Sequence, residues 1–376
     1  MASDSSPAKH SMLELRSLSM QAGNFLIKDV SLSVPEGQCH IIIGPTGSGK
    51  TLLLESVIGF RKPDRGKILL AGRNINKEAV EKRGIAYVPQ DPSIFPHLTV
   101  EENILYGVRI KKTETGMCRD LVGKLVESLR ISHLLKRRAV NLSGGEQQRV
   151  ALVRALAAGD RYLLLDEPLS SLHESLKKEL WFFLRELQTR YKLTILMVTH
   201  DLEEAFFLAD GMSIIINGKL HQTGKKQEIY SMPETMEAAK FLGVRNLLPA
   251  EVIRLDESIL TVHCAHLGRD LVVRQGGDET KRRVKMGEKV IAGIRAEEAM
   301  VLRPEYYKHN EDNMIEGTVV EIVDKGASYT VLFLPDGSGQ HIEVEIPNYA
   351  LKKIQLARGE KRFIVLRSEN IFLLKR

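Results

Sequence analysis

Residues 44–51 read Gly44-Pro45-Thr46-Gly47-Ser48-Gly49-Lys50-Thr51 and fit the pattern G-x-x-x-x-G-K-[ST]. The apolar run His40–Ile43 comes directly before this stretch, and Leu52–Ile58 continues after it with helical spacing. Glycines let backbone N–H groups curl around phosphates, while the lysine reaches the β and γ phosphates and the last hydroxyl binds Mg²⁺. The stretch therefore predicts a phosphate-binding loop between a strand and a helix.

A second motif, Leu163-Leu164-Leu165-Asp166-Glu167, is an apolar strand that ends in two acids. In a parallel sheet this places both carboxylates at the edge where the phosphate-binding loop lies. We expect Asp166 to hold Mg²⁺, through water, and Glu167 to accept a proton from the attacking water. The alternative is that the acids only cap the turn Pro168–Ser170.

The first two thirds of the chain, from about Leu13 to Gly243, alternate short β-rich runs with longer helical periods. This pattern predicts a wound α/β domain with a largely parallel sheet. The clearest strands and helices are expected at His40–Ile43, Tyr162–Leu165 and Leu193–Val198, and at Asp120–Leu135, Val150–Ala158 and Glu174–Arg190.

The remaining third consists of short β-branched runs separated by turn residues, which predicts a small β-barrel or sandwich. Pro335-Asp336-Gly337 is a hairpin signal within it. The expected strands are Ile259–Cys264, Leu271–Val273, Lys289–Ile294, Thr318–Val323, Tyr329–Leu334, His341–Ile346 and Phe363–Leu366. We place a disordered tail at 1–12, the α/β domain at 13–240 and the β domain at 241–376, with the boundary near Ser231–Val244.

Composition limits the classes of protein that the chain can belong to. The chain has 376 residues, enough for two domains at roughly 150 residues each. It has no apolar run of about 18 residues, and its Ser-rich start, Met1–Ser11, lacks the apolar core of a secretion signal, so we expect the protein in the cytosol.

The three cysteines, Cys39, Cys118 and Cys264, form no CxxC pair, which argues against a disulfide framework and against a zinc site. The net charge of +6 is consistent with phosphate, nucleic acid or membrane partners, but its scattered residues favour an ordinary solvated surface.

A third motif, Leu142-Ser143-Gly144-Gly145-Glu146-Gln147-Gln148-Arg149, precedes a helical run. It resembles the signature of ATP-binding cassette (ABC) ATPases, and the three motifs together extend the resemblance over residues from about 13 to 232. The resemblance implies a P-loop NTPase fold with a RecA-like core and a helical subdomain, and ATP and Mg²⁺ as cofactors. It also implies a homodimer in which Leu142–Gln147 of one subunit contact the ATP held by the other.

The same resemblance assigns roles to single residues. Gln90, after the apolar run Ile85–Val88, matches the glutamine that contacts Mg²⁺ and water, so that Thr51, Gln90 and Asp166 are the expected magnesium site. His200 matches the histidine that touches the γ-phosphate, and with Glu167 and Gln90 it makes the expected catalytic set. Phe25 is the candidate for stacking on adenine, although it could equally be a core residue.

One segment departs from the family pattern. Ser170-Ser171-Leu172-His173 matches the segment that couples the two ATP sites, where the family usually has an acid in place of His173. This puts the rate and the coupling in doubt, but not nucleotide binding. If His173 lies at the dimer contact, ATPase activity should change near its ordinary pKa of about 6.5.

Two further segments resemble those of importers that use an extracytoplasmic binding protein. Phe95-Pro96-His97-Leu98-Thr99-Val100-Glu101-Glu102-Asn103-Ile104 resembles the segment that lines the groove for a membrane permease. The C-terminal part resembles the regulatory (TOBE, OB-like) domain of this group. Its Gly293-Ile294-Arg295-Ala296-Glu297-Glu298 is close to Gly-Ile-Arg-Pro-Glu-Asp, although Ala296 replaces the proline. The expected place of the protein is therefore the cytoplasm, peripheral on the inner face of the cell membrane.

Within the importers, three segments look most like the molybdate, tungstate and sulfate ATPases: Gly23-Asn24-Phe25, Gly47–Glu55 and Gly243–Leu248. Sugar, polyamine and ferric-iron ATPases share most of the rest and remain alternatives. A nucleic-acid-associated cassette is a further alternative, but basic residues interleaved with exposed aromatics are missing, so no nucleic acid partner is expected. A regulatory, non-hydrolysing cassette is supported only by His173.

Overall fold

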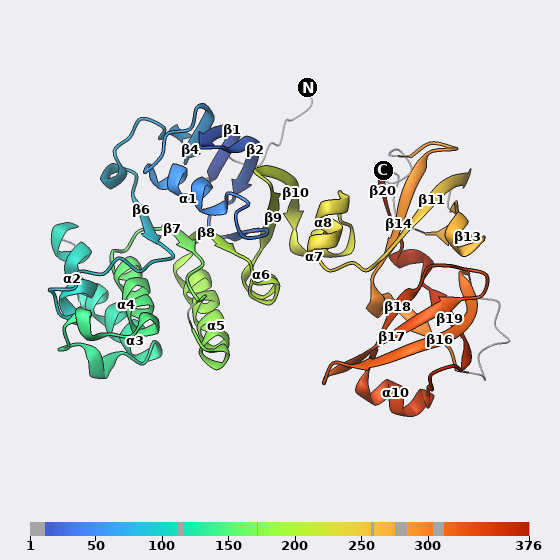
Figure 1. Ribbon diagram of the computed structural model, residues 1–376. Helices are drawn as coiled ribbons and strands as arrows, with labels where there is room; N and C mark the ends of the chain where they lie inside the picture. The colour runs from blue at the N-terminus through green and yellow to red at the C-terminus, as the bar shows by residue number, and fades with distance from the viewer. Residues whose placement is uncertain are drawn as a thin grey trace, which may run out of the picture. The chain divides into compact units, whose positions relative to one another are not determined.

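The computed structural model describes residues 12–111, 116–170, 172–256, 259–274, 284–303 and 312–375. The chain separates into two compact units between Lys226 and Gln227 (Figure 1). Within the described residues, no helix is both long enough and apolar enough to cross a membrane. The domain boundaries at 12/13 and 240/241 stay predictions.

The first unit is built on a ten-stranded sheet in the order β5-β4-β1-β2-β10-β9-β3-β8-β7-β6. Strands β9, β3, β8, β7 and β6 pair in parallel, which confirms the predicted parallel sheet for this half. The strands are β1 (Leu13–Ala22), β2 (Phe25–Val34), β3 (Cys39–Ile43), β4 (Arg65–Leu70), β5 (Arg73–Asn74), β6 (Ile85–Val88), β7 (Tyr162–Asp166), β8 (Thr194–Thr199), β9 (Gly211–Ile216) and β10 (Lys219–Lys225).

The other half of this sheet is mainly antiparallel, which the sequence pattern does not predict; only β2 and β10 pair in parallel there. Strands β1 and β2 form a hairpin whose last pair is Ala22 with Phe25, so the connection is Gly23-Asn24 alone. Gly23 has a φ of +58°, a conformation that suits glycine in a two-residue hairpin. Such a short connection permits only antiparallel pairing.

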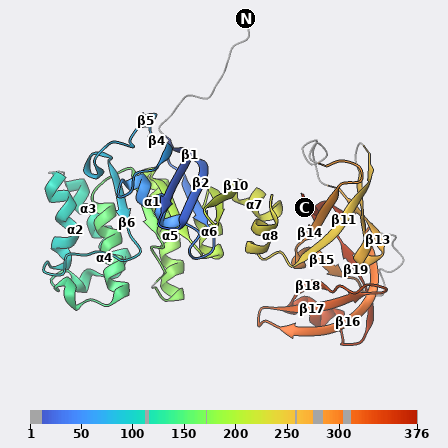
Figure 2. The ribbon, with the colours of Figure 1, turned by 45° about the horizontal axis from the view of Figure 1, so that its top comes forward.

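Helices cover the sheet and form a separate group at one end. The helices are α1 (Lys50–Ile58), α2 (Val100–Lys111), α3 (Gly116–Ser128), α4 (Gly144–Ala157), α5 (Glu174–Tyr191) and α6 (Leu202–Leu208), with short 3₁₀ turns at Val80–Lys82, Ser132–Leu134 and Ala139–Asn141. Helix α7 (Lys226–Ser231) begins at the last residue of the first unit, and its other residues belong to the second. Helices α2, α3 and α4 pack together in both Figure 1 and Figure 2. The helix predicted at Asp120–Leu135 is wrong at its end, because α3 stops at Ser128 and Arg130 has a φ of +52°, which breaks the helical path.

The second unit consists mainly of two five-stranded antiparallel sheets, β13-β12-β11-β14-β20 and β15-β19-β16-β17-β18, around a shared apolar core. Its elements are α8 (Met236–Phe241), β11 (Asn246–Leu255), β12 (Leu260–Cys264), β13 (Arg269–Val273), β14 (Lys289–Ile294), β15 (Ala299–Val301), β16 (Met314–Asp324), β17 (Ser328–Pro335), β18 (Ile342–Pro347), α10 (Asn348–Ile354), β19 (Lys361–Leu366) and β20 (Phe372–Lys375). The predicted β domain is confirmed, and Pro335-Asp336-Gly337 starts the connection of the β17–β18 hairpin. Helix α10 was not predicted.

A buried carboxyl in the first unit gives its stability a pH dependence. Glu204 is 4% exposed, and burial raises its pKa from 4.5 to about 7. The folded protein therefore binds the proton of the Glu204 carboxyl more tightly than the unfolded chain does. As a result, the free energy of unfolding falls as the pH rises from about 4.5 to about 7. The single tryptophan, Trp181, is 2% exposed and lies in the same unit, so its fluorescence follows the unfolding of that unit.

We predict that Glu204→Gln stabilises the first unit by about 1–3 kcal/mol above pH 7, because no buried charge has to form. Below pH 4.5 the variant and the wild type should unfold alike. Urea unfolding followed by Trp181 fluorescence at pH 4.5 and pH 8 measures both. The control is Glu203→Gln, an exposed neighbour, for which no such difference is expected. Equal stabilities of Glu204→Gln and wild type at pH 8 would contradict the prediction.

Candidate functional site

The glycine-rich segment 44–51 forms the turn between β3 and α1. A Cβ on Gly44 would lie 1.9 Å from the backbone oxygen of Ile215, so no larger residue fits at this position. Gly49 has a φ of +94°, and a Cβ there would lie 2.7 Å from the Phe25 ring. The turn therefore brings the N-terminus of α1 and its free N–H groups to the surface of a pocket, which favours an anion.

Lys50 projects from the first turn of α1 and is buried. Its Nζ donates hydrogen bonds to the carbonyl oxygens of Gly44 at 2.8 Å and Pro45 at 3.0 Å. Burial lowers the pKa of Lys50, while the nearby carboxylates of Glu167 and Asp166 raise it. The Lys50 ammonium is thus held inside the loop, and the carboxylates of Glu167 and Asp166 that balance its charge lie at the end of β7.

Asp166 ends β7 and is 1% exposed. Thr51 donates a hydrogen bond to its Oδ1 at 3.1 Å, and the Tyr87 hydroxyl lies 3.5 Å from its Oδ2. Burial raises the pKa of Asp166 to about 6. A cation bound beside this carboxylate would offset the desolvation cost and lower the pKa again.

The donor set around Asp166 fits Mg²⁺ better than it fits a metal held by protein ligands alone. The described residues contain no group of three or more His, Cys, Asp or Glu side chains that could hold a metal. One carboxylate and one hydroxyl are what Mg²⁺ uses when phosphates and waters complete its shell. In addition, Ser48 Oγ is buried in the phosphate-binding loop and has no hydrogen-bond partner in the described part of the chain, which leaves it available to a ligand.

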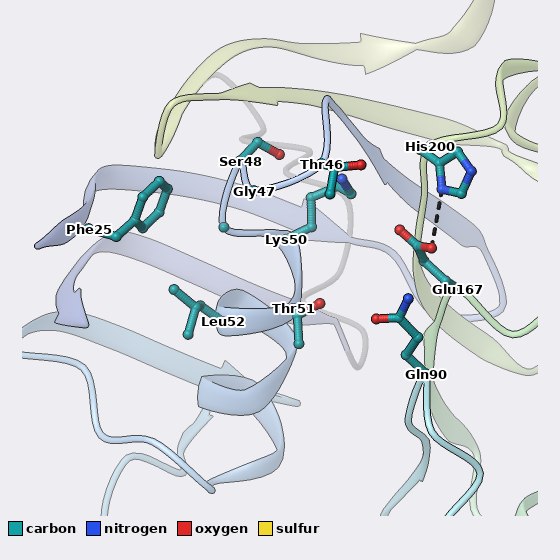
Figure 3. A pocket seen from close by; sticks show the side chains of 11 residues that line it. Phe25, Thr46, Gly47, Ser48, Lys50, Thr51, Leu52, Gln90, Glu167 and His200 are labelled. Carbon is teal, nitrogen blue, oxygen red and sulfur yellow. Dashed lines mark ion pairs between the residues drawn. The ribbon is translucent and has the colours of Figure 1, made fainter. Parts of the chain in front are cut away.

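Glu167 and His200 face each other at the open side of the pocket. His200 Nδ1 lies 3.2 Å from Glu167 Oε2, with the imidazole 55% and the carboxylate 15% exposed (Figure 3). The backbone of Glu167 has a φ of +45°, a conformation that residues other than glycine rarely adopt. Such strain at an acid beside a phosphate-binding loop is typical of a catalytic position.

These residues line one pocket of about 370 Å³. Its walls are Phe25, Thr46, Gly47, Ser48, Gly49, Lys50, Thr51, Leu52, Gln90, Glu167 and His200. The structure thus brings together the predicted catalytic and adenine-stacking residues and all of the predicted phosphate-binding residues except Gly44 and Pro45, and Thr51 joins Asp166 to this set through their hydrogen bond. Sequence reasoning missed Tyr87, Leu52 and the contacts that fix the Glu167 backbone. Tyr87 lies in the strand that precedes Gln90, but its sequence position carries no separate signal.

The signature residues Leu142–Gln147 do not line this pocket. Ser143 precedes α4, and its N–H and hydroxyl donate hydrogen bonds to Glu146 at 2.7 Å and 2.8 Å. These bonds lower the pKa of Glu146. Gly144 and Gly145 open the helix, and the first N–H groups of a helix favour an anion. That it serves the ATP of a partner subunit stays a prediction.

The segment 170–173 also lies outside the pocket lining, and Ser171 lies outside the described residues. Ser170 Oγ donates to the Glu167 carbonyl at 3.0 Å, and Leu172 is buried. His173 is exposed and precedes α5, where its Nδ1 lies 3.2 Å from Ser175 Oγ. An acid at this position would cap the α5 N–H groups, which the imidazole does not do.

Comparison with known proteins gives two family matches and several close relatives. The model for "ABC transporter" matches residues 27–170, and that for "TOBE domain" matches residues 310–373. The "Molybdate/tungstate import ATP-binding protein WtpC" of Pyrococcus horikoshii is 38% identical over 84% of this chain and 87% of its own length. The "Spermidine/putrescine import ATP-binding protein PotA" of Thermotoga maritima is 32% identical over 93% of this chain and 94% of its own length.

Among solved structures, a dimeric ATP-binding cassette, MJ0796, bound to ADP and Pi has a TM-score of 0.52 and 26% identity. The match covers 57% of this chain and 98% of that one. The part of this chain that aligns with that structure is therefore no longer than the first unit.

We predict that His173→Asp raises the midpoint of thermal unfolding of the first unit, because an acid at this position caps the first N–H groups of α5, which the imidazole does not. The variant should also change the rate of ATP turnover if position 173 lies at the predicted dimer contact. Trp181 fluorescence melts and turnover at one fixed pH measure the two effects. His133→Asp, at another exposed histidine, is the control. An unchanged turnover rate in His173→Asp would remove the idea that His173 lies at a dimer contact.

Proposed function

Because the chain belongs to the ATP-binding subunits of ABC transporters, and is thus an ATPase that binds ATP, we propose that it drives uptake of an oxyanion through a separate membrane permease. The observation that carries the proposal is the 38% identity to the molybdate/tungstate import protein over 87% of that protein's length. The substrate class that we propose is molybdate, tungstate or sulfate.

A polyamine is the second candidate substrate. The spermidine/putrescine import protein aligns with 93% of this chain, which is more than the molybdate/tungstate protein aligns with, but at a lower identity of 32%. Both relatives carry the description of import ATP-binding proteins, so the reaction is the same in either case. Only the transported compound differs.

In the proposed reaction, the 44–51 loop and Lys50 hold the ATP phosphates, and the Phe25 ring stacks on the adenine. Thr51, Asp166 and Gln90 would hold Mg²⁺, which supplies neutralisation of phosphate charge when bound. Asp166 is already held by Thr51, so little reorganisation is needed.

Glu167 accepts the proton of the attacking water, and His200 orients the Glu167 carboxylate through their 3.2 Å contact. The His200 ring, which is more exposed than that carboxylate, would contact the γ-phosphate. The proposed reaction is hydrolysis of the terminal phosphate of ATP, in which the chain positions water and stabilises charge.

The proposed working form is a dimer in which Leu142–Gln147 of one subunit close over the ATP of the other. The dimeric cassette structure supports the dimer itself. The permease is proposed to dock at Phe95–Ile104, where the Phe95 ring packs on Tyr106 with 4.4 Å between ring centroids, and Arg154 lies over its face. An extracytoplasmic binding protein would act through the permease, on the other side of the membrane. No nucleic acid partner is part of the proposal.

The experiment that tests the substrate class is uptake in host cells that lack this chain. We predict that the wild-type chain restores accumulation of molybdate, tungstate or sulfate, measured as the metal or as labelled sulfur, and leaves spermidine uptake unchanged. Lys50→Ala, which removes the phosphate-binding ammonium, is the inactive control. Restored spermidine uptake without any oxyanion uptake would replace the proposed substrate with the polyamine.

A further inference from the structure

The backbone of Glu167 is held in its strained conformation by four hydrogen bonds. Its N–H donates to the Val198 carbonyl at 3.0 Å. Its own carbonyl accepts from Ser170 N at 3.2 Å, from Ser170 Oγ at 3.0 Å and from Gln148 Nε2 at 3.2 Å. Because φ is +45°, the conformation persists only while its surroundings fix it. These bonds therefore set the direction of the Glu167 carboxylate.

Three of the four bonds come from near neighbours in the sheet or the following turn. The fourth comes from Gln148, which lies on α4, in the helical group α2–α4. Gln148 is 2% exposed, so water does not compete for the hydrogen bond that its amide donates to Glu167. The carbonyl of Glu167 thus responds to the position of α4 as well as to the sheet.

The same helix begins with the signature residues. Ser143 precedes α4, and Gly144, Gly145 and Gln148 belong to its first turns. A helix moves as a rigid element, so a displacement at its N-terminus also displaces the Gln148 amide. The anion-binding end of α4 and the backbone of Glu167 are therefore connected through one side chain.

We propose that Gln148 is a positioning residue for Glu167 and that it couples the occupancy of the signature segment to the competence of the general base in the same subunit. The inference rests on the proposed function, in which Glu167 accepts the proton of water and the signature contacts a second ATP. When the signature segment binds phosphate, α4 is fixed in place, the Gln148 bond seen in the structure is kept and Glu167 points at the water. Each ATP site then depends on the other through the signature segment and the Gln148 side chain of one chain.

The test is Gln148→Met, which keeps the length of the side chain and removes the amide donor. We expect kcat for ATP to fall at least about tenfold, because a misplaced base loses most of its efficiency, while KM stays within about threefold. Binding of a fluorescent ATP analogue should be unchanged, since Gln148 does not line the pocket. A merely structural role would lower stability without this division between kcat and KM.

The matched control is Gln188→Met. Gln188 is also a buried glutamine, 6% exposed, whose amide donates to a backbone carbonyl, that of Gly37, but it lies on α5 away from the pocket. We expect it to lower the unfolding midpoint as much as Gln148→Met does and to leave kcat unchanged. Trp181 fluorescence measures stability in both variants.

Ser170→Ala provides a second test that does not disturb the core, because the Ser170 hydroxyl is exposed and donates to the same carbonyl. It should lower kcat and not KM, and its effect combined with Gln148→Met should be smaller than the product of the two single effects. If Gln148→Met fails to fold, a normal kcat in Ser170→Ala overturns the proposal.

The outcomes distinguish a failure of the proposed function from a failure of the role of Gln148 alone. Wild-type protein that never hydrolyses ATP, even with a permease supplied, would overturn the proposed function and this inference with it. Wild-type turnover together with an unchanged kcat in Gln148→Met would overturn only the role of Gln148. Wild-type turnover with a selective loss of kcat in Gln148→Met and not in Gln188→Met supports it.

Discussion

The parallel register of β3, β8 and β7 is the constraint on which the site depends. Ile43 pairs with Thr199, and Asp166 pairs with Val198, so three strands end at one level. The phosphate-binding loop follows β3, Asp166 ends β7 with Glu167 directly after it, and His200 follows β8, so these groups meet at one edge. A shift of one residue in any pair would turn these side chains to the opposite face and take the site apart.

The electrostatics at this edge follow from the same geometry. Lys50 and Asp166 are both buried, and burial disfavours both charges, lowering the pKa of the lysine and raising that of the aspartate. Each is held by neutral partners, namely loop carbonyls for Lys50 and the Thr51 hydroxyl for Asp166. A site that maintains opposite charges at a desolvation cost is prepared for a ligand that carries both signs, as a nucleotide with its metal does.

Sequence reasoning predicted the parallel half of the sheet and every residue of the pocket except Leu52, because short motifs with fixed spacing follow each strand. It did not predict what depends on distant contacts. The antiparallel strands follow from the Gly23-Asn24 hairpin, and α3 ends at Ser128 because Arg130 takes a left-handed conformation. The strain at Glu167 and its bond from Gln148 join residues of separate elements, and no local pattern carries such pairs.

The central claim is that two copies of this chain enclose ATP between them and that Glu167 then starts its hydrolysis. The most direct measurement is ATP turnover by the wild type and by Glu167→Gln, together with their size in solution with and without ATP. The account predicts that Glu167→Gln loses turnover and accumulates as an ATP-dependent dimer, which a further Lys50→Ala change abolishes. Turnover by Glu167→Gln at the wild-type rate, or a variant that stays monomeric with ATP, would contradict it.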